Sequence, residues 1–134
     1  MLMTQETMPS VDAWLKEAKK SPKALQEGMY LVHNGTVRQT PKALVRQGFD
    51  DGTKVERMTF DYNAEKVEKA IAAAYEMAGI FHINVWLNKG ELVVGDDIML
   101  VLIGGDIRPH VIDALQFLVG EIKNHCVTEI EQKK

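Results

Sequence analysis

The chain has 134 residues, of which 46% are hydrophobic and 26% charged, and this is the composition of one globular domain with its own core. Its formal net charge of −3 argues against a general nucleic-acid-binding protein, because such proteins carry a basic surface. No apolar run approaches the roughly 18 residues that cross a bilayer, so we expect no membrane partner either.

Residues 1–27 are predicted to form a helical lead-in to a single domain that spans residues 1–134. Ser10 is of a type that caps helix N-termini, and the apolar residues after it recur at helical spacing over residues 11–20. Pro22 lies just beyond this helix and ends it. The start of the chain lacks the charged and apolar regions of a signal peptide, so we expect a cytoplasmic protein.

Two strands follow, over residues 28–38 and 54–62. Both segments are rich in β-branched and aromatic residues and alternate with a period of two, which is typical of half-buried strands. On the first strand, the side chains of Leu31, His33 and Val37 are expected on one side.

The connection between these strands, residues 39–53, is longer than a tight turn and is expected to contain at most one helical turn, beginning at Pro41. It carries two cations, Lys42 and Arg46. These side chains are either solvent-exposed or part of a mobile lid over a site. The sequence alone favours solvent exposure.

The second half of the chain alternates strands and helices. Asn63 caps a helix over residues 63–79, which Gly79 ends, and the elements after it are a strand over 80–87, a turn over 88–97, a fully buried strand over 98–103, a helix over 108–123 and a last strand over 127–132. This order lacks regular βαβ alternation. It predicts an α+β fold in which helices pack on a mixed or antiparallel sheet.

Few residues have the spacing that a metal site or a catalytic motif requires. The four histidines are scattered, so we expect no metal site, and no nucleotide-binding or nucleophile motif indicates a cofactor. The single cysteine, Cys126, cannot form an internal disulfide, which fits a reducing compartment. The remaining candidates are three cations, Arg38, Arg108 and Lys123, each of which taken alone is more often solvated than functional.

The last predicted helix sets the distance between two of these cations. Fifteen residues at about 1.5 Å each separate Arg108 from Lys123 by roughly 22 Å along the helix axis. One small ligand therefore cannot contact both side chains of one helix, but it can if two protomers associate. Arg108 and Pro109 suit an anion site at the helix start, because free backbone N–H groups and the helix dipole favour the same anion.

Three short patterns occur in a defined order from Gly28 to about Gln132. The first pattern lies on the first predicted strand and ends in Val-Arg. The second pattern reads Gly-x-Leu-x-x-Gly-Asp. The third pattern lies on the last predicted helix, begins with an arginine, and ends in an apolar residue followed by lysine. They fall on Gly28, Gly35, Val37 and Arg38, on Gly90, Leu92, Gly95 and Asp96, and on Arg108, Ala114, Phe117, Ile122 and Lys123. In their order and spacing, the chain resembles the large, catalytic subunit of molybdopterin synthase.

The resemblance implies the large-subunit fold, which is α/β-hammerhead-like, and a sulfur transfer. Two sulfurs pass to cyclic pyranopterin monophosphate from a thiocarboxylate at the Gly-Gly tail of a small ubiquitin-like subunit. Large subunits of this family form a homodimer with a small subunit on each side. By position, Arg38, Arg108 and His33 would bind the substrate, and Lys123 would act in acid–base chemistry or as an amine near the thiocarboxylate, a role that a pKa lowered by burial suits.

The chain also departs from the family pattern. The family's second lysine falls on Ile130, and histidine stands at position 33 where the family has phenylalanine. Lys133 and Lys134 are candidate substitutes for the missing lysine. Three functions stay open: a working synthase subunit, a dimeric module that binds a pterin or another phosphorylated ligand without catalysis, and, least favoured, a sulfur carrier that uses Cys126.

Overall fold

The computed structural model describes residues 2–3, 7–48 and 50–134, so parts of the predicted lead-in and Phe49 of the long connection lie outside the described residues. Most of the strands belong to a four-stranded sheet. Its order is β1 (Leu2–Met3), β4 (Ile80–Leu87), β6 (Asp97–Gly105) and β2 (Met29–Thr36). The pairs β4–β6 and β6–β2 are antiparallel, whereas β1 runs parallel to β4.

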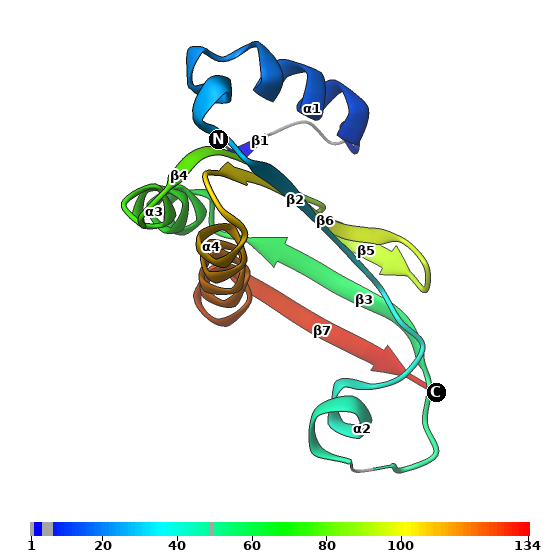
Figure 1. The fold of residues 1–134 in the computed structure, drawn as a ribbon. Helices are drawn as coiled ribbons and strands as arrows, with labels where there is room; N and C mark the ends of the chain where they lie inside the picture. Colours follow the sequence, from blue (N-terminus) through cyan, green and yellow to red (C-terminus); the bar gives the residue numbers. More distant parts are fainter. Residues whose placement is uncertain (1, 4–6, 49) are drawn as a thin grey trace.

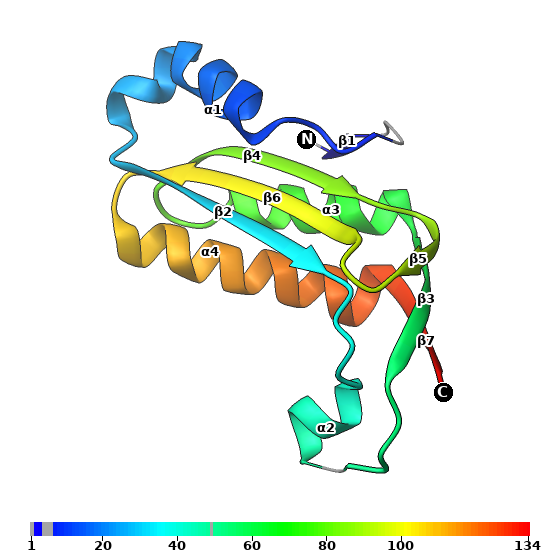
Figure 2. The same ribbon diagram turned by 90° about the vertical axis from the view of Figure 1, so that its right-hand side faces the viewer.

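A second sheet of three antiparallel strands continues the body of the domain beside the first. Its order is β5 (Gly90–Val93), β3 (Val55–Tyr62) and β7 (Val127–Lys133). The consecutive strands β2 and β3 therefore belong to different sheets. The chain between them runs away from both sheets and carries the short helix α2 (Lys42–Gln47), which stands apart from the other helices (Figure 2).

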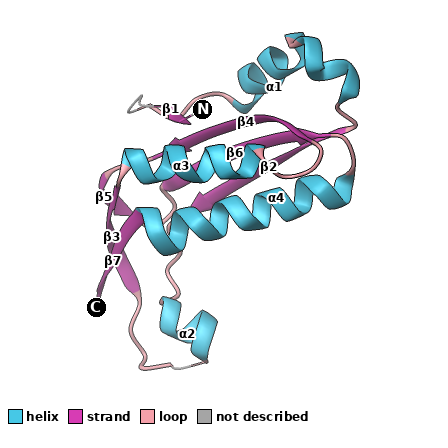
Figure 3. Cartoon of the chain, turned by 90° about the vertical axis from the view of Figure 1, so that its left-hand side faces the viewer, coloured by secondary structure: helices cyan, strands magenta, loops and turns pink. Residues whose placement is uncertain are grey.

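Helices cover both faces of the four-stranded sheet. The helices α3 (Ala64–Tyr75) and α4 (Arg108–Glu121) lie side by side on one face, and α1 (Val11–Lys20) lies on the other (Figures 1 and 3). The π-helix η2 (Ile122–Cys126) extends α4 by one wide turn and leads into β7. None of the described helices is long and apolar enough to cross a membrane.

The central strand β6 connects the two halves of the core. Its side chains alternate between the faces, and Val101 and Ile103 join the main core while Leu100 and Leu102 join a smaller one. In the smaller core, Trp14 and Ala18 of α1 pack with Trp86 of β4, and all three are buried. The prediction of a strand at 98–103 buried on both faces is confirmed, as is the α+β fold with helices packed on a mixed or antiparallel sheet.

The turn between α3 and β4 passes close to the start of α4. Gly79 has a φ of 76°, and a Cβ at this position would lie 2.1 Å from Oδ1 of Asp106. That oxygen accepts hydrogen bonds from the backbone N–H of Ile107 at 2.6 Å and from Nδ1 of His110 at 2.7 Å. Glycine is therefore required both for the left-handed backbone and for space.

Some elements differ from the sequence-based prediction. The turn predicted over residues 88–97 contains β5, a four-residue edge strand too short for its alternation to be recognised. The lead-in is not wholly helical, because β1 pairs with β4 and Leu2 is buried. A 3₁₀ turn, η1 (Pro22–Gln26), follows α1 where the sequence predicted only the end of a helix.

A cationic pocket around Lys123

A small enclosed pocket lies where the two sheets, η2 and α2 meet. Four cations and two carboxylates surround it, together with one hydroxyl and two apolar side chains. The lining residues are Thr36, Arg38, Lys42, Arg46, Met58, Ile98, Lys123, Glu129 and Glu131. Because the cations outnumber the carboxylates, the pocket has the electrostatics of a site for a small anionic group.

Lys123 enters the pocket from the end of the last helix. It lies in η2, directly after α4, and is about half-buried. Desolvation lowers the pKa of its amine below 10.5, and Arg46, Lys42 and Arg38 lower it further, whereas Glu129 opposes the change. An amine with a lowered pKa exchanges its proton closer to neutral pH, which is the property required of a lysine in acid–base or nucleophilic chemistry.

His33 faces the same region from β2. Its Nε2 atom is buried and has no hydrogen-bond partner among the described residues. Desolvation lowers the pKa of its ring, and the charge of Lys123 lowers it further. His33 therefore brings a neutral imidazole with a free nitrogen close to Lys123, although it does not line the enclosed space itself.

Arg38 lies just beyond the end of β2, at the rim of the pocket. Its Nε donates a hydrogen bond of 3.1 Å to the carbonyl oxygen of Thr40, which fixes the guanidinium beside the lining residues. The structure thus brings together Arg38 and Lys123, with His33 adjacent. Each of these residues was predicted as a site residue from the sequence.

Arg108, the fourth predicted site residue, lies elsewhere. It is the first residue of α4, is exposed, and is separated from Lys123 by the whole length of that helix. No described side chain caps this helix start, since Ile107 has the N-cap position. The helix-length calculation from the sequence therefore holds, and Arg108 can reach a pocket only as part of a second chain.

The last strand turns its two glutamates toward the pocket and Ile130 away from it. Ile130, which the resemblance aligns with the family's second lysine, is 55% exposed and does not line the pocket. Its neighbours Glu129 and Glu131 point inward, because alternate residues of a strand face opposite sides of the sheet. Lys133 and Lys134 are exposed and do not line the pocket, so neither replaces the missing lysine there.

The expected solvent exposure is wrong for Lys42, whereas Arg46 is exposed as expected. Both side chains line the pocket, and Lys42 is only 30% exposed because its Nζ forms an ion pair with the almost fully buried carboxylate of Glu129. The backbone N–H of Lys42 also donates to both carboxylate oxygens of Glu131 at 3.3 Å. The alternation of residues 127–132 could have placed the two glutamates on one side, but no local pattern signals these contacts across the fold.

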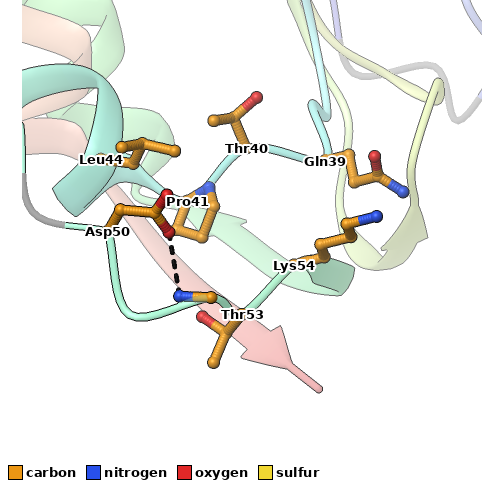
Figure 4. A pocket seen from close by; sticks show the side chains of 8 residues that line it. Gln39, Thr40, Pro41, Leu44, Asp50, Thr53 and Lys54 are labelled. Atoms are coloured by element: carbon orange, nitrogen blue, oxygen red, sulfur yellow. Dashed lines mark hydrogen bonds between the residues drawn. The ribbon is translucent and has the colours of Figure 1, made fainter.

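A larger hollow of about 250 Å³ lies on another side of α2, between its start and the loop before β3 (Figure 4). Pro41, Leu44, Asp50 and Lys54 are among its lining residues. With one carboxylate and one cation, it lacks the excess of positive charge found around Lys123. Among the residues that the structure describes, no group of three or more histidine, cysteine or acidic side chains is placed to hold a metal ion.

The α+β scaffold thus places a partly buried lysine in a pocket whose cations outnumber its carboxylates. A family model described as MoaE protein matches residues 4–125, so the chain belongs to the MoaE family, that of the large subunit of molybdopterin synthase, in molybdenum cofactor biosynthesis. Among curated proteins, none matches the sequence significantly.

Solved structures with the same fold include three that are distant in sequence. The MoaE protein of Burkholderia ambifaria is 16% identical, with a TM-score of 0.72 over 99% of this chain and 86% of that one. The molybdopterin synthase of Staphylococcus aureus is 18% identical, with a TM-score of 0.66 over 81% of this chain and 77% of that one. A complex of subunits 1 and 2 of the molybdopterin-converting factor from Helicobacter pylori is 16% identical, with a TM-score of 0.62 over 92% and 78%.

Proposed function

We propose that this chain is a working large subunit of molybdopterin synthase, which acts in the cytoplasm. In this reaction, sulfur passes from the thiocarboxylate of a small ubiquitin-like subunit to cyclic pyranopterin monophosphate. The observation that carries the proposal is the position of Lys123, a half-buried amine with a lowered pKa in a pocket lined by three further cations. Membership of the MoaE family supports the same reaction.

Three side chains in or beside the pocket are suited to particular roles in this reaction. Arg38 is suited to the phosphate of the substrate, because a guanidinium can bind phosphate oxygens through two parallel hydrogen bonds. Lys123 is suited to move protons at the reacting carbon or to meet the thiocarboxylate as an amine. His33, with its free Nε2, is suited to bind a polar edge of the pterin next to Lys123.

We further propose that the active form is a homodimer with one small subunit on each side. Arg108 supports this, because an exposed cation at a helix start, far from the pocket of its own chain, is well placed to serve the pocket of a second chain. The complex of subunits 1 and 2 from Helicobacter pylori supports a two-subunit assembly for a protein of this fold.

Reconstitution tests the proposal. The full chain, mixed with a thiocarboxylated small subunit and cyclic pyranopterin monophosphate, is expected to produce molybdopterin, measured by chromatography of the released product. The same mixture with a small subunit that ends in an ordinary carboxylate is the control and should give none. Absence of product from the thiocarboxylated mixture contradicts the proposed sulfur transfer.

A second function is favoured by one observation, namely the two carboxylates of Glu129 and Glu131 in the pocket. They reduce its positive charge and are compatible with a module that binds a pterin or phosphorylated ligand without catalysis. Calorimetry with the pterin monophosphate separates the two functions. Binding without turnover in the reconstituted mixture supports the binding module, and turnover excludes it.

A further inference from the structure

The ion pair between Lys42 and Glu129 connects α2 to the neighbourhood of Lys123. Glu129 lies on β7 with its side chain only 6% exposed, and among the described carboxylates it is the one whose charge raises the pKa of Lys123. Among the described residues, however, the ion pair of Glu129 is formed with Lys42, and Lys123 has no carboxylate within ion-pair distance. Two ammonium groups therefore compete for a single buried acceptor.

Lys42 also holds α2 in place. Its backbone N–H donates to Glu131 while its Nζ pairs with Glu129, so both contacts join α2 to the inward face of β7. On another side, α2 adjoins the hollow lined by Pro41 and Leu44 rather than packed side chains (Figure 4). A six-residue helix with such limited packing has little stability of its own.

With α2 in this position, the pocket is closed to a substrate. The space enclosed around Lys123 is about 20 Å³, which is room for about one water molecule. Sites for small organic ligands are typically about 300–1,000 Å³. Lys42 and Arg46 of α2 line this space, so the space widens on this side only if α2 is displaced, and this displacement breaks the contacts of Lys42.

We propose that Lys42 is a positioning residue for Lys123: it fastens α2 over the pocket and, by pairing with Glu129, withholds that carboxylate from the Lys123 amine. When α2 moves away, Glu129 loses its partner and becomes available to Lys123. The closed form thus keeps the amine unpaired, and the open form lets the carboxylate pair with the ammonium.

Among the described residues, six charged or titratable groups surround Lys123. They are His33 on β2 and Arg38 beyond it, Lys42 and Arg46 on α2, and Glu129 and Glu131 on β7. Only Lys42 has both a backbone contact with one glutamate and an ion pair with the other among these described groups. Its substitution therefore changes the competition at one point and leaves the other cations in place.

The test is an NMR titration of Lys123 in the full chain labelled with ¹³C at the lysine Cε, with the signal assigned from Lys123→Arg. Lys42→Met keeps the aliphatic stem, removes a cation and frees Glu129, so the pKa of Lys123 is expected to rise by about one unit, a tenfold gain in proton affinity. Glu129→Gln is expected to lower the pKa. When Lys42→Met is combined with Glu129→Gln, it should have a much smaller effect than it has alone, since the two groups act as a pair.

Matched variants separate this role from a general loss of charge or structure. Lys42→Arg retains the ion pair and should leave the pKa of Lys123 unchanged. Lys89→Met breaks an exposed ion pair of 3.6 Å with Asp61 elsewhere on the surface and should also leave it unchanged. In Lys42→Met, the amide protons of α2 should exchange at least about tenfold faster, because its fastening to β7 is lost.

A pKa of Lys123 that falls or stays constant in Lys42→Met overturns the competition for Glu129, and unchanged exchange in α2 overturns the fastening. The role of Lys42 rests on the proposed function of Lys123, but the titration needs neither the small subunit nor the pterin. Loss of sulfur transfer with an intact titration result would therefore reject the proposed reaction alone.

Discussion

Replacement of Lys123 by alanine is expected to reduce molybdopterin formation by about 10²- to 10⁴-fold, the range attributed to one positioned acid–base group. The amine is half-buried and its pKa is lowered by desolvation and by the neighbouring cations. Alanine removes both the proton carrier and the amine. Single-turnover rates with saturating small subunit and substrate measure the loss, since they separate the chemical step from binding.

Lys123→Arg is the matched variant, because it keeps the positive charge and fails to release a proton near neutral pH. We expect it to bind substrate and to be as inactive as Lys123→Ala. Full activity in Lys123→Arg would mean that Lys123 serves only as a charge. Native activity in Lys123→Ala would remove this lysine from the mechanism.

The lowered pKa also predicts how stability depends on pH. The folded-state pKa of Lys123 lies below 10.5, so between these two values the unfolded chain binds more protons than the folded one. The contribution of Lys123 to the free energy of unfolding therefore rises with pH across this window. Urea unfolding at several pH values should show a smaller rise in Lys123→Met, whose side chain has no proton to release.

Phe60→Ala is expected to lower the free energy of unfolding by about 3–5 kcal/mol, as is typical of a large side chain removed from a core. Phe60 is fully buried on β3, the central strand of the three-stranded sheet, and is paired in register with Glu129 on β7. Its loss leaves a cavity beneath the strand that carries the inward-facing carboxylates. Equilibrium unfolding in urea, followed by circular dichroism, measures the change.

Arg57→Ala on the same strand is the control. Its guanidinium forms an exposed ion pair of 3.7 Å with Glu91, and such pairs contribute at most about 1 kcal/mol. A cost for Phe60→Ala no larger than that for Arg57→Ala would contradict the described core of this sheet.

The sequence predicts the longer elements because each buries one face against the rest of the domain. The helix capped by Asn63 and the last helix have the helical periodicity that such burial requires. The strand at residues 98–103 is the exception, because it is buried on both faces and is recognised as an uninterrupted apolar run. Periodicity identifies a strand but not its partner. The assignment of β2 and β3 to separate sheets depends on contacts between distant segments, and no local pattern encodes these.

The site residues likewise divide into those that the sequence identifies and those whose positions depend on contacts between distant segments. Arg38 and Lys123 were recognised by resemblance, and the distance of Arg108 from Lys123 follows from the rise of an α-helix. Lys42 was not recognised, because its position depends on two glutamates nearly ninety residues away in the sequence. The resemblance aligned Ile130 with the family's second lysine, and strand alternation turns this residue outward.

The most direct test of the proposed composite site mixes two variants that are each expected to be nearly inactive, Arg108→Ala and Lys123→Ala, after exchange of subunits between dimers. If the pocket uses Lys123 of one chain and Arg108 of its partner, half of the dimers are mixed and each has one native site, so about a quarter of the native rate of molybdopterin formation should return. A rate no higher than that of the separate variants would contradict a site shared between two chains.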